Sequence, residues 1–159
     1  MLQKIFDSAS SQYVGDFVWI SNAVPPTIEQ VLPRRSTLSR SAAGERHLRQ
    51  VIATNIDTVM VVCGLDGDFN PARIERYFVL IEGSGAKAVV VLTKADLAAD
   101  AQAMTEQLKA RMPAGTEIHA INAKTGFGVD ALLAHLGPGS STVLVGSSGA
   151  GKSTLTNTL

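Results

Sequence analysis

The sequence has little cysteine and little histidine, which limits the disulfides and metal sites it can build. Cys63 is the single cysteine, so an internal disulfide is excluded. The three histidines are His47, His119 and His135, and with Cys63 they show no spacing that is typical of a zinc cluster. We therefore expect neither a disulfide nor a zinc cluster within these 159 residues.

Long apolar runs and an excess of one charge are also lacking. No stretch of about 18 apolar residues occurs, and the N-terminal MLQKIFDSASSQYVGDF is too polar for a signal peptide. The net charge of zero argues against binding nucleic acid through overall basicity and leaves only local patches. With 45% hydrophobic and 18% charged residues, we expect a globular, cytoplasmic monomer with neither a membrane nor DNA as a partner.

From Thr54 onward, apolar runs alternate with segments of helical periodicity. The runs rich in β-branched residues predict strands at 58–63, 87–92, 116–121 and 142–145. Asn70 and Pro71 suit the cap and first turn of the helix that follows the first strand. This alternation predicts an α/β fold with a mainly parallel sheet, helices on both faces, and a ligand site at the carboxyl ends of the strands.

Each of the first three strands is followed by a segment whose apolar residues recur at helical spacing. The residues expected to face the sheet are Ile74, Tyr77, Phe78 and Ile81 in the first, Leu97, Ala101, Met104 and Leu108 in the second, and Val129, Leu132, Leu133 and Leu136 in the third.

The first 50 residues have a different character. VGDFVWIS and TIEQVLP are short strand candidates interrupted by prolines, as in a piece of a small antiparallel β domain that is too short to close a five-stranded barrel. Residues 34–50 carry five arginines against one glutamate. Two interpretations of this basic stretch stay open: a solvated linker, or a segment that faces RNA.

The sequence ends on VLVGSSGAGKSTLTNTL, which matches the phosphate-loop pattern G-x-x-x-x-G-K-[ST] between a strand and a helix. Glycines let several backbone N–H groups point inward, Lys152 reaches the β and γ phosphates as the catalytic candidate, and the Ser153 hydroxyl is the expected Mg²⁺ ligand. The alternative is a plain serine- and glycine-rich loop. The expected phosphate-side residues are Gly146, Ser147, Ser148, Gly149, Ala150, Gly151, Lys152, Ser153 and Thr154.

A base-selecting element stands where the second strand of the parallel sheet ends. TKAD matches [NT]-K-x-D, in which the Asp96 carboxylate accepts hydrogen bonds from two guanine N–H groups that adenine lacks. The aliphatic stem of Lys94 is expected to lie along the base plane. The expected residues of this element are Thr93, Lys94, Ala95 and Asp96.

Two further stretches have competing interpretations. NAKTG, which begins at Asn122, resembles the [ST]-A-K element that supports the guanine carbonyl through Asn122, Ala123 and Lys124, although a plain turn before Gly128 would give the same letters. DGDFN opens like a calcium loop, but Tyr77 stands where the bidentate glutamate belongs, so calcium is not expected.

The base-reading TKAD precedes NAK, and the phosphate loop comes last, so the motif order is circularly permuted. Such a rearrangement is tolerated where the original termini lie close together. With LPRRSTLSR, AAGE, ATNIDTVMVV, DFNPARIERYF, LTKADL and GSSGAGKSTLTN, the chain resembles the ribosome small-subunit-dependent GTPase A family. The resemblance implies a partial OB-fold-like β segment and basic linker at 1–50, and a circularly permuted P-loop GTPase domain with an incomplete sheet at 51–159.

The resemblance also implies a function, with limits. It implies a GTP-hydrolysing factor that binds GTP or GDP with Mg²⁺ and acts with the small ribosomal subunit and its rRNA in late subunit maturation. Switch I, switch II and the zinc-binding domain of the family lie beyond Leu159, so zinc is expected only there and this chain alone is not expected to be a competent GTPase. The alternatives are a nucleotide- or RNA-binding module without turnover, and an ATP-using P-loop protein.

Overall fold

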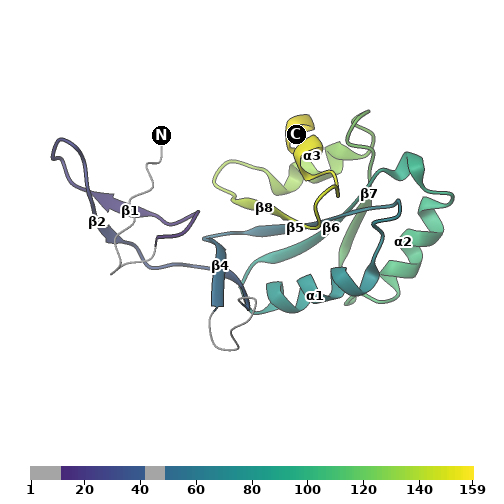
Figure 1. The fold of residues 1–159 in the computed structure, drawn as a ribbon, viewed down its shortest axis with the longest axis horizontal. Helices are drawn as coiled ribbons and strands as arrows, with labels where there is room; N and C mark the ends of the chain where they lie inside the picture. Colours follow the sequence, from purple (N-terminus) through teal and green to yellow (C-terminus); the bar gives the residue numbers. More distant parts are fainter. Residues whose placement is uncertain (1–11, 42–48) are drawn as a thin grey trace.

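Four apolar strands form a parallel sheet in the computed structural model, which describes residues 12–41 and 49–159. They are β5 (Thr58–Gly64), β6 (Lys87–Thr93), β7 (Glu117–Ala120) and β8 (Thr142–Val145), in the spatial order β7-β6-β5-β8 (Figure 1). The four strands predicted from apolar runs are confirmed, with ends that differ by one residue at most.

The last strand of the chain lies beside the first strand of the sheet. β8 pairs with β5 in parallel, from Thr58 opposite Thr142 to Val61 opposite Val145. On its other side β5 pairs with β6 over its whole length. Both faces of β5 are covered, so its seven residues are all buried, as expected of a central parallel strand.

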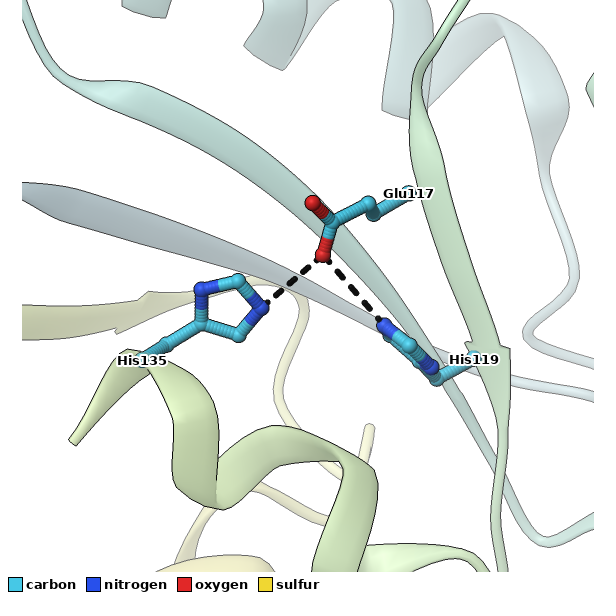
Figure 2. Close-up of side chains that lie close together, drawn as sticks. All are labelled: Glu117, His119 and His135. Atoms are coloured by element: carbon cyan, nitrogen blue, oxygen red, sulfur yellow. Dashed lines mark hydrogen bonds and ion pairs between the residues drawn. The ribbon is translucent and has the colours of Figure 1, made fainter.

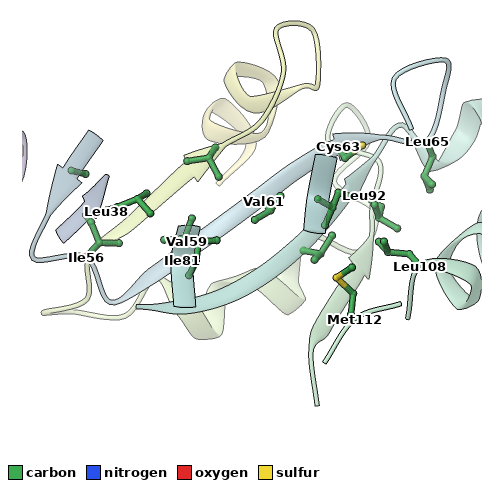
Figure 3. Close-up of a cluster of buried hydrophobic side chains, with 14 residues drawn as sticks. Leu38, Ile56, Val59, Val61, Cys63, Leu65, Ile81, Leu92, Leu108 and Met112 are labelled. Atoms are coloured by element: carbon green, nitrogen blue, oxygen red, sulfur yellow. The ribbon is translucent and has the colours of Figure 1, made fainter. Parts of the chain in front are cut away.

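Helices cover both faces of the sheet, as predicted. Helices α1 (Pro71–Glu82) and α2 (Ala101–Lys109) pack on one face, and η2 (Val129–His135) and α3 (Lys152–Thr158) pack on the other (Figure 1). Alternate strand residues supply the two cores. Val59 and Val61 face α1, in the cluster drawn in Figure 3, whereas Met60 belongs to the cluster under η2 and α3.

The helix caps explain where the first two helices begin. The Asn70 side chain accepts a hydrogen bond from the Arg73 N–H at 2.9 Å, which confirms the predicted cap of α1. The Asp100 carboxylate accepts one from the Ala103 N–H at 2.9 Å, so α2 begins only at residue 101. The expectation that Leu97 faces the sheet in this helix is therefore wrong: it lies in the 3₁₀ turn η1 (Ala95–Leu97) and is 64% exposed.

The third predicted helix is a 3₁₀ helix, η2. With three residues per turn, side chains at i and i+3 share a face, so Val129 and Leu132 are buried together. Leu133, which an α-helical period would also place inside, is 50% exposed, and Leu136 is exposed as well.

The N-terminal part contains two antiparallel strand pairs. β1 (Val18–Ile20) pairs with β2 (Ile28–Val31), and β3 (Thr37–Ser41) pairs with β4 (Arg49–Thr54). The linker interpretation of residues 34–50 is thus wrong for the parts that form β3 and the start of β4, and Leu38 is buried in the core beside α1. Glu45 and Arg46 of that stretch, and the AAGE motif, lie outside the described residues. The domain division at residue 50 stays a prediction, although β4 runs across it.

Asp16 holds the N-terminal strands against the end of β4. Its carboxylate accepts hydrogen bonds from Arg34 at 2.7 and 2.8 Å and from the Thr54 hydroxyl at 2.7 Å. Gly15 makes the close approach possible, because a Cβ at its φ of +96° would collide with the Thr54 carbonyl oxygen. The hydrogen bond from Arg34, above all, lowers the Asp16 pKa to about 2. In the described part of the chain, no helix is long and apolar enough to cross a membrane.

The Asp16 contact predicts a loss of stability in acid. The Asp16 pKa falls from 3.8 to about 2 on folding, so the ionised form favours the folded state by about 2 kcal/mol at neutral pH. This contribution should be lost progressively as the pH falls from about 5 to about 1, through the folded pKa. Denaturant unfolding of the wild type and Asp16→Asn across this range is the measurement. A variant whose pH profile matches that of the wild type would contradict the prediction.

Leu132 and Leu133 form a matched test of the 3₁₀ geometry. Leu132→Ala should lower the free energy of unfolding by about 2–5 kcal/mol, because it leaves a cavity in the core. Leu133→Ala removes an exposed side chain and should change it by no more than about 0.5 kcal/mol. Equal losses in chemical denaturation would indicate an α-helical period instead.

Candidate functional site

The phosphate loop follows β8 and ends at the start of α3. Gly146 has a φ of +150°, and a Cβ there would collide with the Val62 carbonyl oxygen of β5. Gly151 has a φ of +92° and is the cap residue of α3. The neighbouring strand therefore requires glycine at the first position of the motif, and the helix start favours it at the sixth.

Lys152 is folded back over its own loop. Its amino group donates hydrogen bonds to the carbonyl oxygens of Gly146 at 3.0 Å and Ser147 at 2.6 Å. Ser153 and Thr154 are exposed on the first turn of α3. A cradle of glycines with a lysine amino group and an exposed hydroxyl fits a Mg²⁺-bound phosphate, with Ser153 as the residue that would hold the ion.

Thr93 connects the base-selecting element to the phosphate loop. It ends β6, is 1% exposed, and its hydroxyl donates a hydrogen bond to the Ala150 carbonyl oxygen at 2.6 Å. Gly151 lies against the same side chain, since a Cβ there would be 3.3 Å from the Thr93 hydroxyl oxygen. The two motifs, far apart in sequence, thus share a buried hydrogen bond.

Lys94 takes the left-handed conformation, with a φ of +58°, and turns the chain out of the sheet. Its amino group lies 2.6 Å from the Asp66 carboxylate, and this hydrogen bond is the main cause of a lowered Asp66 pKa. The backbone of Ala95 is held by the end of the neighbouring strand, because its N–H donates to the Ile121 carbonyl oxygen at 3.1 Å. Asp96 follows in η1, one turn beyond the end of β6.

The loop that starts at Asn122 is both a turn and a wall of the site. The Asn122 side-chain oxygen accepts hydrogen bonds from the N–H groups of Lys124 at 2.9 Å and Thr125 at 3.3 Å. The Thr158 hydroxyl of α3 donates to the Ala123 carbonyl oxygen at 2.6 Å. Asn122, which stands where serine or threonine is usual, therefore closes the turn. The bond from Thr158 joins the same loop to α3.

These three segments enclose one cavity of about 270 Å³ at the carboxyl ends of the strands. It is lined by Thr93, Lys94, Asp96, Leu97, Asn122, Ala123, Lys124, Gly151 and Thr154. Leu97 is the one lining residue not expected from the sequence. The other expected site residues do not line this cavity; they are Ala95, Gly146, Ser147, Ser148, Gly149, Ala150, Lys152 and Ser153.

Sequence reasoning missed two carboxylates, Asp68 beside the phosphate loop and Asp66 beside Lys94. Asp68 accepts hydrogen bonds from the Ser147 hydroxyl and from Arg73, both at 2.6 Å. Burial raises the Asp68 pKa, but the bonds from Ser147 and Arg73 outweigh it, and the net pKa is lowered. With Asp66 it belongs to the DGDFN stretch, weighed only as a calcium loop. The sequence signal that could have identified Asp66 and Asp68 is their position directly after the carboxyl end of a predicted parallel strand, where ligand sites form.

A phosphate loop whose base-side wall precedes it in sequence defines a circularly permuted P-loop protein. The chain belongs to the RsgA GTPase family, whose model matches residues 31–159. It is 55% identical, over 157 residues, to the small ribosomal subunit biogenesis GTPase RsgA of Xanthomonas campestris pv. campestris (strain B100). That match covers 97% of this chain and 42% of the relative, so the chain spans less than half of the relative's length.

Two solved structures share the fold. The crystal structure of YjeQ from Thermotoga maritima matches with a TM-score of 0.72 and 27% identity, over 95% of this chain and 52% of that one. The structure of YloQ, a circularly permuted GTPase, matches with a TM-score of 0.66 and 23% identity, over 94% of this chain and 50% of that one. The predicted fold class, a circularly permuted α/β P-loop GTPase, is confirmed.

The Thr93 hydroxyl should be needed to hold the phosphate loop. Thr93→Val leaves the Ala150 carbonyl without its buried partner and should lower the free energy of unfolding by about 1–3 kcal/mol. Amide exchange in residues 147–151 should become faster. Thr93→Ser keeps the hydroxyl and is the matched control. Equal exchange rates in the two variants would show that the hydrogen bond does not order the loop.

Proposed function

We propose that this chain is the guanine-nucleotide-binding part of a GTPase that acts in maturation of the small ribosomal subunit. The observation that carries the proposal is the cavity in which Asp96 and residues 122–124 meet Gly151 and Thr154 of the phosphate-loop segment. The family, and the name of the 55%-identical relative, support the reaction and the partner.

The residues have distinct roles in this proposal. Asp96 accepts two guanine N–H groups, Lys94 lies along the base, and residues 122–124 frame the base edge. Loop N–H groups hold the phosphates, and Lys152 exchanges its bonds to Gly146 and Ser147 for bonds to phosphate oxygens. Ser153 would hold Mg²⁺, which would supply neutralising charge to the phosphates.

Hydrolysis in this proposal is the attack of a water on the γ phosphate in the complete protein. Positioning and electrostatic stabilisation contribute the catalysis, and no covalent intermediate with the protein forms. The partners are the small subunit and its rRNA. We further propose a cytoplasmic monomer that does not act on a membrane or on DNA.

The proposed activity is tested by hydrolysis in the full-length protein. GTP turnover is measured with and without purified small subunits, and we expect stimulation by the subunits. No turnover in either condition would favour the alternative of a nucleotide- or RNA-binding module without turnover. Preference for ATP would favour an ATP-using protein.

Asp96→Asn tests the base assignment within this chain. Loss of the carboxylate should weaken GDP binding about 10- to 100-fold, because two charge-assisted hydrogen bonds change. Binding of xanthosine diphosphate should become tighter, since its base offers an acceptor to the new amide. Calorimetric titrations of both nucleotides measure the change.

Asp100→Asn is the matched control for that titration. Asp100 caps α2 and does not line the cavity, and asparagine is an equally good cap. Its nucleotide preference should equal that of the wild type. An unchanged preference in Asp96→Asn, or tighter ADP binding, would reject the guanine assignment.

A further inference from the structure

Three side chains that bind metals in other proteins converge at the edge of the sheet, apart from the cavity. Glu117 and His119 extend from β7, and His135 extends toward them from η2 (Figure 2). The Glu117 Oε2 atom lies 3.0 Å from His135 Nε2 and 3.7 Å from His119 Nε2. One ligand atom from each of the three lies within 4.8 Å of the others.

The backbone fixes this arrangement. Glu117 and His119 are two positions apart on a strand, so they share one face, while Ile118 and Ala120 pack into the core on the α1 side. His135 stands three positions after Leu132, and a 3₁₀ helix places it on the same face as that buried residue. β7 and η2 therefore direct Glu117, His119 and His135 toward one another.

His119 lacks a partner that its position demands. Its Nε2 atom is buried and, within the described part of the chain, forms no hydrogen bond. A buried nitrogen without a partner is a cost in free energy, and buried polar atoms normally find one. A bound cation would satisfy it.

Glu117 is prepared to be the anionic ligand. Lys87 pairs with its Oε1 atom at 2.5 Å, which leaves Oε2 to face the two histidines. A partner that orients a ligating carboxylate is typical of metal sites.

We propose that His119, His135 and Glu117 bind a divalent transition ion of the Zn²⁺ class. Zn²⁺ binds imidazole nitrogen and carboxylate oxygen at about 2.0–2.2 Å, so neighbouring ligands of a tetrahedral ion lie roughly 3.3 Å apart. The two separations from Glu117 Oε2, 3.0 and 3.7 Å, bracket that value, and the third pair of ligand atoms lies within 4.8 Å. With three protein ligands at an edge strand, water completes the shell. Two imidazoles favour Zn²⁺ over Mg²⁺ or Ca²⁺.

The ion would join the two ends of one segment. Between β7 and η2 the chain runs through residues 121–128, which include the wall of the cavity. A bond from the ion to each side would restrain that loop. The sequence expectation of no zinc cluster overlooked the site because His135 and Glu117 are 18 positions apart and meet only through the fold.

The test is a calorimetric titration of the metal-free, untagged chain with ZnCl₂ at neutral pH, without nucleotide. One equivalent should bind, and His119→Ala and His135→Ala should each weaken binding at least about tenfold. His47→Ala removes the remaining histidine of the sequence and should leave the affinity unchanged. No binding to the wild type, or equal binding by all three variants, would overturn the proposal.

A second measurement does not depend on variants that fold. In ¹⁵N spectra of the wild type, Zn²⁺ should shift the Nε2 resonances of His119 and His135 together and slow amide exchange in residues 122–128. If Zn²⁺ shifts neither histidine, or shifts only His47, the proposal fails. Because no nucleotide is present, this result is independent of the outcome for Asp96→Asn.

Discussion

The parallel pairing of β8 with β5 is the contact on which the candidate site depends. β8 leads into the phosphate loop and β6 leads into the base-selecting turn. Both strands pair in parallel with β5, which lies between them, so the two turns lie at the same carboxyl end of the sheet. The Gly146 backbone lies so close to the Val62 carbonyl that no side chain fits. The permuted order of the motifs therefore does not disrupt the site, because the pairing of the strands, and not the order of the chain, sets the distance between the phosphate loop and the base-selecting turn.

Polar contacts at the carboxyl ends of the strands preorganise the site. Thr93 holds Ala150, Asp68 holds Ser147, and Lys94 is held by Asp66. Both aspartates are charge-compensated, since Arg73 pairs with Asp68 and Lys94 pairs with Asp66. In the proposed function, a nucleotide would exchange the hydrogen bonds of Lys152 in a loop that is already folded, which lowers the ordering cost of binding.

Sequence reasoning predicted the elements whose physics is local. Continuous apolar runs located all four parallel strands, and the glycine and lysine spacing located the phosphate loop. Sequence reasoning failed where a contact with another residue or segment determines the position of a side chain. Helical spacing alone places Leu97 in the second helix, whereas the Asp100 cap starts that helix later. A 3.6-residue period places Leu133 against the sheet, whereas η2 has three residues per turn. The Ser147 partner of Asp68 and the Glu117 partner of His135 come from distant segments, which no local pattern specifies.

The 3₁₀ form of η2 has consequences at both of its ends. In an α-helix, six residues rotate the side chain by about 600°, so His135 would point roughly 120° away from Val129; at three residues per turn the two share a face. Gly128 begins the turn, and a Cβ there would lie 3.0 Å from the Ala120 carbonyl oxygen, so η2 starts pressed against the end of β7. The same tight turn closes the loop of Asn122 and directs His135 toward Glu117. The shape of the cavity wall and the position of His135 beside Glu117 therefore both depend on the short segment 128–135.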